Sequence, residues 1–334
     1  MMIILLILIT SLLGCSCDIP NSPDEFRVLS YNVENLFDAT LDGSEYPEYQ
    51  TNWSERSYHQ RLKSLSKTLL DSSLRYPDVI VLQEVENERV VGDLLSGYLA
   101  KKGYRSYAVA STPDSAISVG AISRHPIIHS AVHAVPGGRN ILEVVVETPI
   151  EEIVIFVLHA KSQIGEFEET EAIRIEGAKS VKAAVGDYPN HALLVCGDFN
   201  QNPTAVYESG GVQTALVDVA HPSSSAYARG GSLLITGDEA ELGPGVLYNP
   251  YLSEPPPPLG SYSYGGSWQQ YDQILLSSAL FDRRKWEYES FEIIRFEYLL
   301  HPDGTPKRWN LKTLNGYSDH LPVMVTLKLT PWEI

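Results

Sequence analysis

Several apolar runs of this sequence stop at a polar side chain that is able to do chemistry. The run ending in VCGD continues as FNQNP, so Asp198 and Asn200 stand two residues apart. Alternate side chains of an extended chain point to the same side, so the spacing predicts that both polar groups face one site. Three further apolar runs end in an amide, a carboxylate or an imidazole, at Asn32, Glu84 and His159. Because ligands bind where the strands of α/β sheets end, these endings indicate one shared cleft.

Three further polar side chains precede strands late in the chain. GYSDHLPV places Asp319 beside His320 just before the last predicted strand, and Asp272 stands similarly in YDQILLS. A carboxylate such as Asp272 can hold an imidazole in one tautomer. Four of these positions also have an ordinary structural interpretation: a turn for Asn32 and Asp272, a helix start for Glu84, and a hydrogen-bonded core position for His159.

The combination of residue types favours metal-assisted hydrolysis of a phosphate ester. Carboxylate and amide oxygens suit a hard cation, Mg²⁺ or Mn²⁺, which pairs with phosphate oxygens, and nearby amides and imidazoles can donate hydrogen bonds to phosphate. Other hydrolytic chemistries lack their signatures. The sequence contains neither a His-Glu-x-x-His or paired Cys-x-x-Cys zinc pattern nor a Gly-x-Ser-x-Gly nucleophile elbow.

Helical and strand patterns alternate around these groups and predict one mixed α/β domain. A strand over 26–31, a helix with apolar residues from Tyr58 to Leu69 and a strand over 78–82 come first. Closely spaced strands follow, which favours antiparallel pairing, at 104–110, 118–123, 141–147 and 153–158. After them we expect a helix over 173–184, strands over 192–196, 273–277 and 323–329, and mostly loop over the Gly-, Pro- and Ser-rich segment 201–260.

Composition and the first residues bear on where the protein works. The 334-residue chain has 43% hydrophobic residues and a net charge of -17, which counts against nonspecific gripping of long polyanions. Residues 1–14 are uncharged and apolar, which predicts an export signal, and LLGC resembles a bacterial lipobox. We therefore expect a lipid on Cys15, a tether over 15–25, a folded domain over 26–330 and anchoring to a bacterial membrane; plain secretion is the alternative. Cys17 and Cys196 would remain, too few for a disulfide framework.

Six motifs resemble, in order, those of the endonuclease/exonuclease/phosphatase superfamily, the deoxyribonuclease-I-like fold. They are SYNVENLF from Ser30, LQEVEN from Leu82, HAKS from His159, GDFN from Gly197, YDQILLS from Tyr271 and GYSDHLPV from Gly316. The resemblance spans 26–329. It implies an α/β (α+β) fold, a four-layer α/β/β/α sandwich with a divalent-metal cleft at one edge of two packed sheets.

The resemblance also implies a metal site. Glu84 corresponds to the principal ligand of Mg²⁺ (or Mn²⁺), with Asn32 and Asp319 close to the ion and its water shell.

Catalytic roles are implied for five residues. Asp198 corresponds to the group that orients or deprotonates the attacking water, and Asn200 helps to hold the phosphate. His159 and His320 correspond to phosphate-facing imidazoles, with Asp272 orienting His320.

The substrate stays open because this superfamily includes nucleases, inositol-phosphate phosphatases and sphingomyelin-type phosphodiesterases. The leading hypothesis is an extracytoplasmic nuclease, a monomer that acts on DNA or RNA. A phosphatase or phosphodiesterase of a small or lipid phosphate fits the acidic charge, and a non-catalytic binding lipoprotein is the third hypothesis. Aromatic residues over 260–268 could stack on unpaired bases, contact a sugar or lipid, or simply pack their loop.

Overall fold

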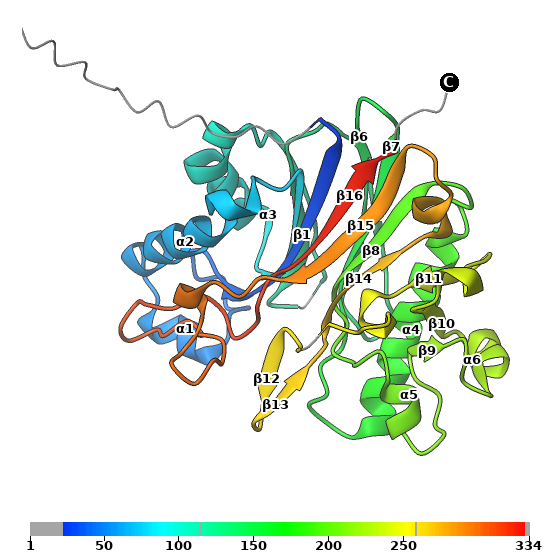
Figure 1. Cartoon of the computed structure of the whole chain (residues 1–334). Coiled ribbons are helices and arrows are strands. Elements are labelled where there is room, and N and C mark those ends of the chain that lie inside the picture. The colour runs from blue at the N-terminus through cyan, green and yellow to red at the C-terminus, as the bar shows by residue number, and fades with distance from the viewer. Residues whose placement is uncertain (1–22, 114, 258, 331–334) are drawn as a thin grey trace, which may run out of the picture.

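A computed structural model describes residues 23–113, 115–257 and 259–330, and these form two large mixed sheets and a small hairpin (Figure 1). The first sheet has the strand order β15-β16-β1-β2-β4-β3. Its strands are β1 (Glu25–Leu36), β2 (Val79–Val85), β3 (Ser106–Ala110), β4 (Ser118–Ser123), β15 (Trp286–Ile293) and β16 (Val323–Leu329). Within it, β1 and β2 run parallel, so their carboxyl ends lie at the same edge.

The second sheet has the strand order β5-β6-β7-β8-β14-β11-β10-β9. Its strands are β5 (Ile127–His133), β6 (Ile141–Glu147), β7 (Glu152–His159), β8 (Ala192–Asp198), β9 (Leu216–Asp218), β10 (Leu233–Thr236), β11 (Val246–Tyr248) and β14 (Asp272–Leu276). The parallel pair β7 and β8 ends with His159 opposite Asp198, and antiparallel β14 begins with Asp272 opposite Asp198. This register brings three of the predicted residues to one edge.

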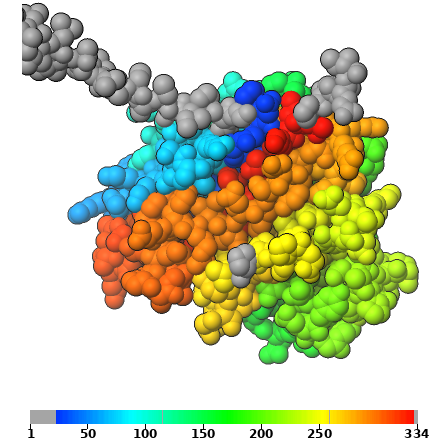
Figure 2. Space-filling view, viewed as in Figure 1, coloured from blue at the N-terminus to red at the C-terminus, as the bar shows by residue number. Residues whose placement is uncertain are grey.

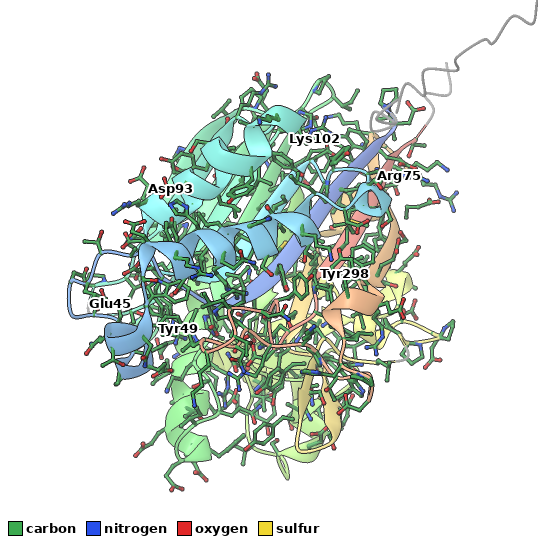
Figure 3. All side chains as sticks on the ribbon, turned by 90° about the vertical axis from the view of Figure 1, so that its left-hand side faces the viewer. Glu45, Tyr49, Arg75, Asp93, Lys102 and Tyr298 are labelled. Carbon is green, nitrogen blue, oxygen red and sulfur yellow. The ribbon has the colours of Figure 1, made fainter. Side chains whose placement is uncertain are left out.

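Helices cover the outer faces of both sheets. They are α1 (Pro47–Asn52), α2 (Glu55–Leu69), α3 (Glu88–Leu94), α4 (Phe167–Val185), α5 (Ala205–Glu208) and α6 (Ser224–Gly230). The hydroxyl of Ser54 caps α2 by accepting a hydrogen bond from the Ser57 amide. Figure 3 shows α2 across the first sheet, with Glu45 and Tyr49 beside its start.

The alternation of side chains divides the core into three layers. In β7, Ile153, Ile155 and Val157 face the first sheet and form a core between the two sheets. The intervening Val154 and Phe156 pack with residues of α4 in a second core. A third core joins the opposite face of the first sheet to the apolar side of α2 and α3. The protein is therefore the four-layer α/β/β/α sandwich that the motifs implied.

Three parts of the chain differ from the sequence-based expectation. The segment 201–260, expected to be mostly loop, contains the short strands β9, β10 and β11, which extend the second sheet. The aromatic stretch at 260–268 contains β12 (Tyr262–Tyr264), which pairs with β13 (Ser267–Gln269) in a hairpin. Strands β5 and β15 were not expected from the sequence; both carry exposed polar side chains and lie at sheet edges, where one side stays in water.

Two predictions concern residues outside the described ranges. The export signal over 1–14 and the lipidated Cys15 lie there, and they stay predictions. Among the described helices, none is long and apolar enough to cross a membrane.

Candidate active site

The structure brings all eight predicted site residues to one edge of the sandwich. Six of them line a cleft of about 790 Å³: Glu84, His159, Asp198, Asn200, Asp319 and His320. Asn32 and Asp272 lie behind its surface, and both are fully buried. The cleft lies between the two sheets, walled on one side by the segment around α1 and on the other by the β12–β13 hairpin.

Asn32 links the two sheets at the floor of the cleft. Its side-chain Nδ2 donates to Glu84 Oε1 at 3.1 Å and to Asp198 Oδ2 at 3.0 Å. Its own Oδ1 accepts from the Glu34 amide at 3.1 Å, which fixes the orientation of the side chain. Both protons of one amide thus hold two carboxylates from different sheets close together.

A β-bulge aims Glu84 into the cleft. The register of β2 against β4 shifts between Gln83 and Val85, and Glu84 has φ of 64°. Such left-handed backbone is costly for a residue with a side chain and is concentrated at functional sites. The second carboxylate oxygen accepts from the Asn35 amide at 2.9 Å. Burial, and then the charge of Asp319, raise the pKa of Glu84 to about 7.

His320 is held by a buried carboxylate. Its Nδ1 lies 2.7 Å from Asp272 Oδ2, and the same oxygen accepts a hydrogen bond from Ser261. Burial alone would lower the pKa of His320, but the charges of Asp272, Asp198 and Asp319 and the hydrogen bond from Nδ1 raise it well above its ordinary value. The Nε2 atom is left 3.9 Å from Asp198 Oδ2, on the side of the cleft.

His159 has a different environment. Its Nε2 lies 3.6 Å from Asp198 Oδ2 and 3.8 Å from Glu84 Oε1. Burial, followed by the charges of Arg139 and His320, lowers its pKa well below the ordinary value, so the imidazole is neutral. Within the described part of the chain, its Nδ1 has no hydrogen-bond partner. The site therefore combines one neutral imidazole, that of His159, with one positively charged imidazole, that of His320.

Asp198 and Asn200 both line the cleft, but the backbone between them is not the extended strand from which the sequence argument placed them together. β8 ends at Asp198, and Asn200 has φ of 48°. The Asn200 amide turns back to donate to Asp198 Oδ1 at 2.8 Å, while its side-chain Nδ2 donates to Ala160 O at 3.2 Å. Burial raises the pKa of Asp198 to about 6, an effect that the positive charge of His320 partly offsets.

Sequence reasoning missed three arginines around the site. Arg139 lines the cleft and donates to Ala160 O at 3.3 Å. Arg308 pairs with Glu34 at 2.7 Å and lies 3.9 Å from Asp319.

Arg61 is fully buried beneath the site, where it donates to the carbonyl oxygens of Val33, Glu34 and Tyr317. It thereby ties the end of β1 to the loop that carries Asp319. Its place on the apolar side of α2 was the one sequence signal that could have revealed it.

The donor set fits a divalent cation. Five carboxylates line the cleft, and Arg139 is the one Arg or Lys among the described residues that do so. Glu84 is partly buried beside this excess of negative charge, which a hard cation would compensate, and carboxylate oxygens are the ligands that Mg²⁺ prefers. A tighter group formed by Asp198, Asp272 and His320 already has a hydrogen bond between Asp272 and His320, so Glu84 and Asp319 are the cleft residues that could hold the cation.

Comparisons with known proteins agree with the fold. The similar solved structures include D. rerio TDP2 complexed with single strand DNA product, with a TM-score of 0.55 and 17% identity over 91% of this chain and 99% of that chain. An endonuclease/exonuclease/phosphatase family protein from Bacteroides thetaiotaomicron has a TM-score of 0.54 and 17% identity, covering 91% of this chain and 97% of that one. Beta toxin 275-280 from Staphylococcus aureus has a TM-score of 0.52 and 16% identity, covering 90% and 99%.

At these identities the likeness shows a shared fold. No functionally curated protein matches the sequence. The sequence profile of the Endonuclease/Exonuclease/phosphatase family matches residues 27–219 and 234–329, which is most of the chain. The protein therefore belongs to the Endonuclease/Exonuclease/phosphatase family.

Proposed function

We propose that this protein is a divalent-metal-dependent phosphodiesterase whose substrate is nucleic acid. Members of its family are typically metal-dependent phosphoesterases. The observation that carries the proposal is the hydrogen-bonded set at the cleft floor, where Asn32 holds Glu84 and Asp198 together beneath two imidazoles. Carboxylates for a cation, a base and phosphate-facing donors are then all within one cleft.

Each residue has a task in such a reaction. Asp198 accepts the proton of a water molecule as the water oxygen bonds to phosphorus, and the bond from phosphorus to the leaving oxygen breaks. The leaving oxygen then takes up a proton from solvent. Neutral His159 and protonated His320 donate hydrogen bonds to the phosphate oxygens, where negative charge increases in the transition state. Asp272 keeps His320 oriented, and Asn200 holds the phosphate.

Glu84 and Asp319 would hold the cation, with Asn32 beside it. When bound, Mg²⁺ or Mn²⁺ supplies positive charge that stabilises the phosphate oxygens during attack. Arg139 adds a further positive charge to the lining of the cleft.

Nucleic acid is favoured as the substrate class because TDP2, which shares this fold, has been solved with a single strand DNA product. A small or lipid phosphate is the second candidate. It is favoured by the five carboxylates that line the cleft, because they would repel the neighbouring phosphates of a long strand.

The test is an activity assay of the full-length protein in mild detergent with Mg²⁺ or Mn²⁺. The substrates are supercoiled plasmid, single-stranded DNA, RNA, inositol phosphates and sphingomyelin. Cleavage of nucleic acid that is lost with EDTA and in Asp198→Ala supports the proposal. The matched control Asp187→Ala changes an exposed aspartate remote from the cleft and should retain activity. Activity confined to the small or lipid phosphates would replace the proposal by the second candidate, and inactivity on every substrate would reject both.

We also propose that the protein acts outside the cytoplasm, attached to a bacterial membrane through a lipid on Cys15. The sequence of residues 1–15 alone supports this part of the proposal. In a bacterial host grown with labelled palmitate, the wild-type protein should incorporate label and Cys15→Ser should not. Equal labelling of both proteins would reject the lipid anchor.

A further inference from the structure

A flat aromatic layer extends from the catalytic edge to the outside of the molecule. The imidazole of His320 stacks on Tyr262, with ring centroids 4.5 Å apart and an interplanar angle of 23°. Tyr264 lies two residues further along β12, on the same face of the strand, with its ring within 13° of that of Tyr262 and 6.4 Å away. Tyr271 is also nearly parallel to Tyr262, at 24°. All four rings line the same cleft.

Only the outermost ring of this layer is widely exposed. Tyr264 is 71% exposed, whereas Tyr262 is covered by His320. The hairpin that carries both tyrosines projects from the lower edge of the molecule in Figures 1 and 2. Gly265 and Gly266 form its turn with φ of 58° and 84°, a backbone that glycine adopts without strain. A large aromatic side chain is therefore held in a defined orientation while its face remains open.

The charge of the cleft requires that much of the binding energy come from uncharged contacts. Proteins that grip nucleic acid along its backbone use several Lys and Arg residues. Here Arg139 alone lines the cleft among the described residues, against five carboxylates. Stacking on an aromatic ring needs no such cations, because every nucleobase has a flat π face.

We propose that Tyr264 is the stacking surface for an unpaired nucleobase attached to the phosphate that is cleaved. This inference rests on the proposed function and narrows it to single-stranded or terminal nucleotides, because a base inside a duplex has both faces covered by its stacked neighbours. A base placed over Tyr264 continues the layer that His320 begins over Tyr262. The phosphate attached to that base would enter the cleft that Tyr264 shares with His320 and Asp198, where we propose that hydrolysis takes place.

The test compares two substrates that differ in the base. Thymidine 5′-(p-nitrophenyl phosphate) and methyl p-nitrophenyl phosphate have the same leaving group and the same charge, so the ratio of their kcat/KM values isolates the nucleoside contact. The wild-type protein should prefer the thymidine ester, and Tyr264→Ala should lower that ratio roughly 5- to 140-fold. Tyr264→Phe keeps the ring and should keep the ratio. Tyr207→Ala removes a comparably exposed tyrosine, 51% exposed, outside the cleft and should leave the ratio unchanged.

Three outcomes would overturn the inference. The first is an unchanged ratio in Tyr264→Ala. The second is a preference for octyl p-nitrophenyl phosphate over the thymidine ester that is lost in the same variant, which would assign the ring to an aliphatic chain. If none of the nitrophenyl esters is hydrolysed, the nucleic acid assay decides the proposed function, and calorimetric binding of thymidine 5′-methyl phosphate decides the inference separately. Tighter binding to wild type than to Tyr264→Ala supports it, and equal binding overturns it.

Discussion

Asn32→Asp tests whether the amide at the cleft floor is what holds two carboxylates together. The substitution keeps the shape of the side chain but places an oxygen where Nδ2 now donates to Glu84 at 3.1 Å and Asp198 at 3.0 Å. The two hydrogen bonds to Glu84 and Asp198 are then replaced by repulsion between oxygen atoms, at a position that is fully buried. We expect a large loss of stability without any change in packing volume.

The magnitude follows from the distances. Two unit charges about 3 Å apart in surroundings with an effective dielectric constant of about 20 repel by roughly 5.5 kcal/mol. The new carboxyl group avoids this repulsion by staying protonated in the folded protein. Keeping the proton at pH 7 costs about 4 kcal/mol, because the unperturbed pKa of an aspartate is about 3.9. The free energy of unfolding should therefore fall by at most about 4 kcal/mol at pH 7, and by about 1.5 kcal/mol at pH 5 from the same relation.

The sign of the pH dependence follows from a pKa that is higher in the folded than in the unfolded protein. Below the pKa of the unfolded state, the new aspartate is protonated in both states and the loss of stability disappears. As the pH rises above that pKa, the loss grows until the pH reaches the pKa of the folded state. Urea denaturation of the metal-free variant and of the metal-free wild type at pH 5 and pH 7 measures the loss in the free energy of unfolding at each pH. Added Mg²⁺ should recover part of the loss, because the cation offsets the added charge.

Asn249→Asp is the matched control. Asn249 is also fully buried, but its amide donates to Gln273 at 2.7 Å, and its oxygen accepts from the Tyr251 amide at 3.0 Å. Its aspartate variant should lose stability through burial alone and should not be recovered by Mg²⁺. Asn32→Asp with wild-type stability at pH 7, or equal recovery of both variants by Mg²⁺, would refute the reasoning.

Three further predictions concern other parts of the site. Asp272→Asn removes the charge that holds His320 at 2.7 Å and should lower kcat about 10- to 150-fold with little change in KM; unchanged kcat would contradict the positioning role. Mg²⁺ should raise the Tm more at pH 8 than at pH 6, because protons compete for Glu84, whose pKa is about 7; equal shifts would place the ion elsewhere. Gly197→Ala should destabilise the fold by about 3 kcal/mol or more in urea denaturation, because its Cβ would lie 2.0 Å from the Leu158 carbonyl oxygen; wild-type stability would show that β7 can move aside.

The predicted site residues lie close together because apolar patterns determine where strands end. Asp198 and His159 each follow a run whose side chains are buried on both faces, a pattern that fixes the strand to within a residue or two. Parallel pairing of β7 with β8 and of β1 with β2 then brings the strand ends to one edge. The motifs added the order of the strands, which periodicity alone does not give.

Other features depend on tertiary structure and left no comparable local signal. Strands β9, β10 and β11 are three or four residues long and lie in a stretch rich in glycine, proline and serine, so only pairing with longer neighbours makes them strands. Arg139 lies in a loop before β6 and reaches the cleft only because β6 pairs with β7. Arg61 is a charged residue on a buried helix face, and a hydrophobic pattern does not predict that a charged residue is buried.

The geometry around Asp198 also separates the roles of its two oxygens. Oδ1 already accepts the backbone amide of Asn200 at 2.8 Å, a bond that exists because Asn200 adopts left-handed backbone. Oδ2 faces the Asn32 amide at 3.0 Å, His159 at 3.6 Å and His320 at 3.9 Å. If Asp198 is the base, Oδ2 is the oxygen that takes the proton, and the strain at Asn200 serves to keep that oxygen turned toward the cleft. An extended chain through Asn200 would remove the hydrogen bond to Oδ1 and leave the Asn32 amide to orient the carboxylate, so the left-handed residue has a role that strand alternation could not indicate.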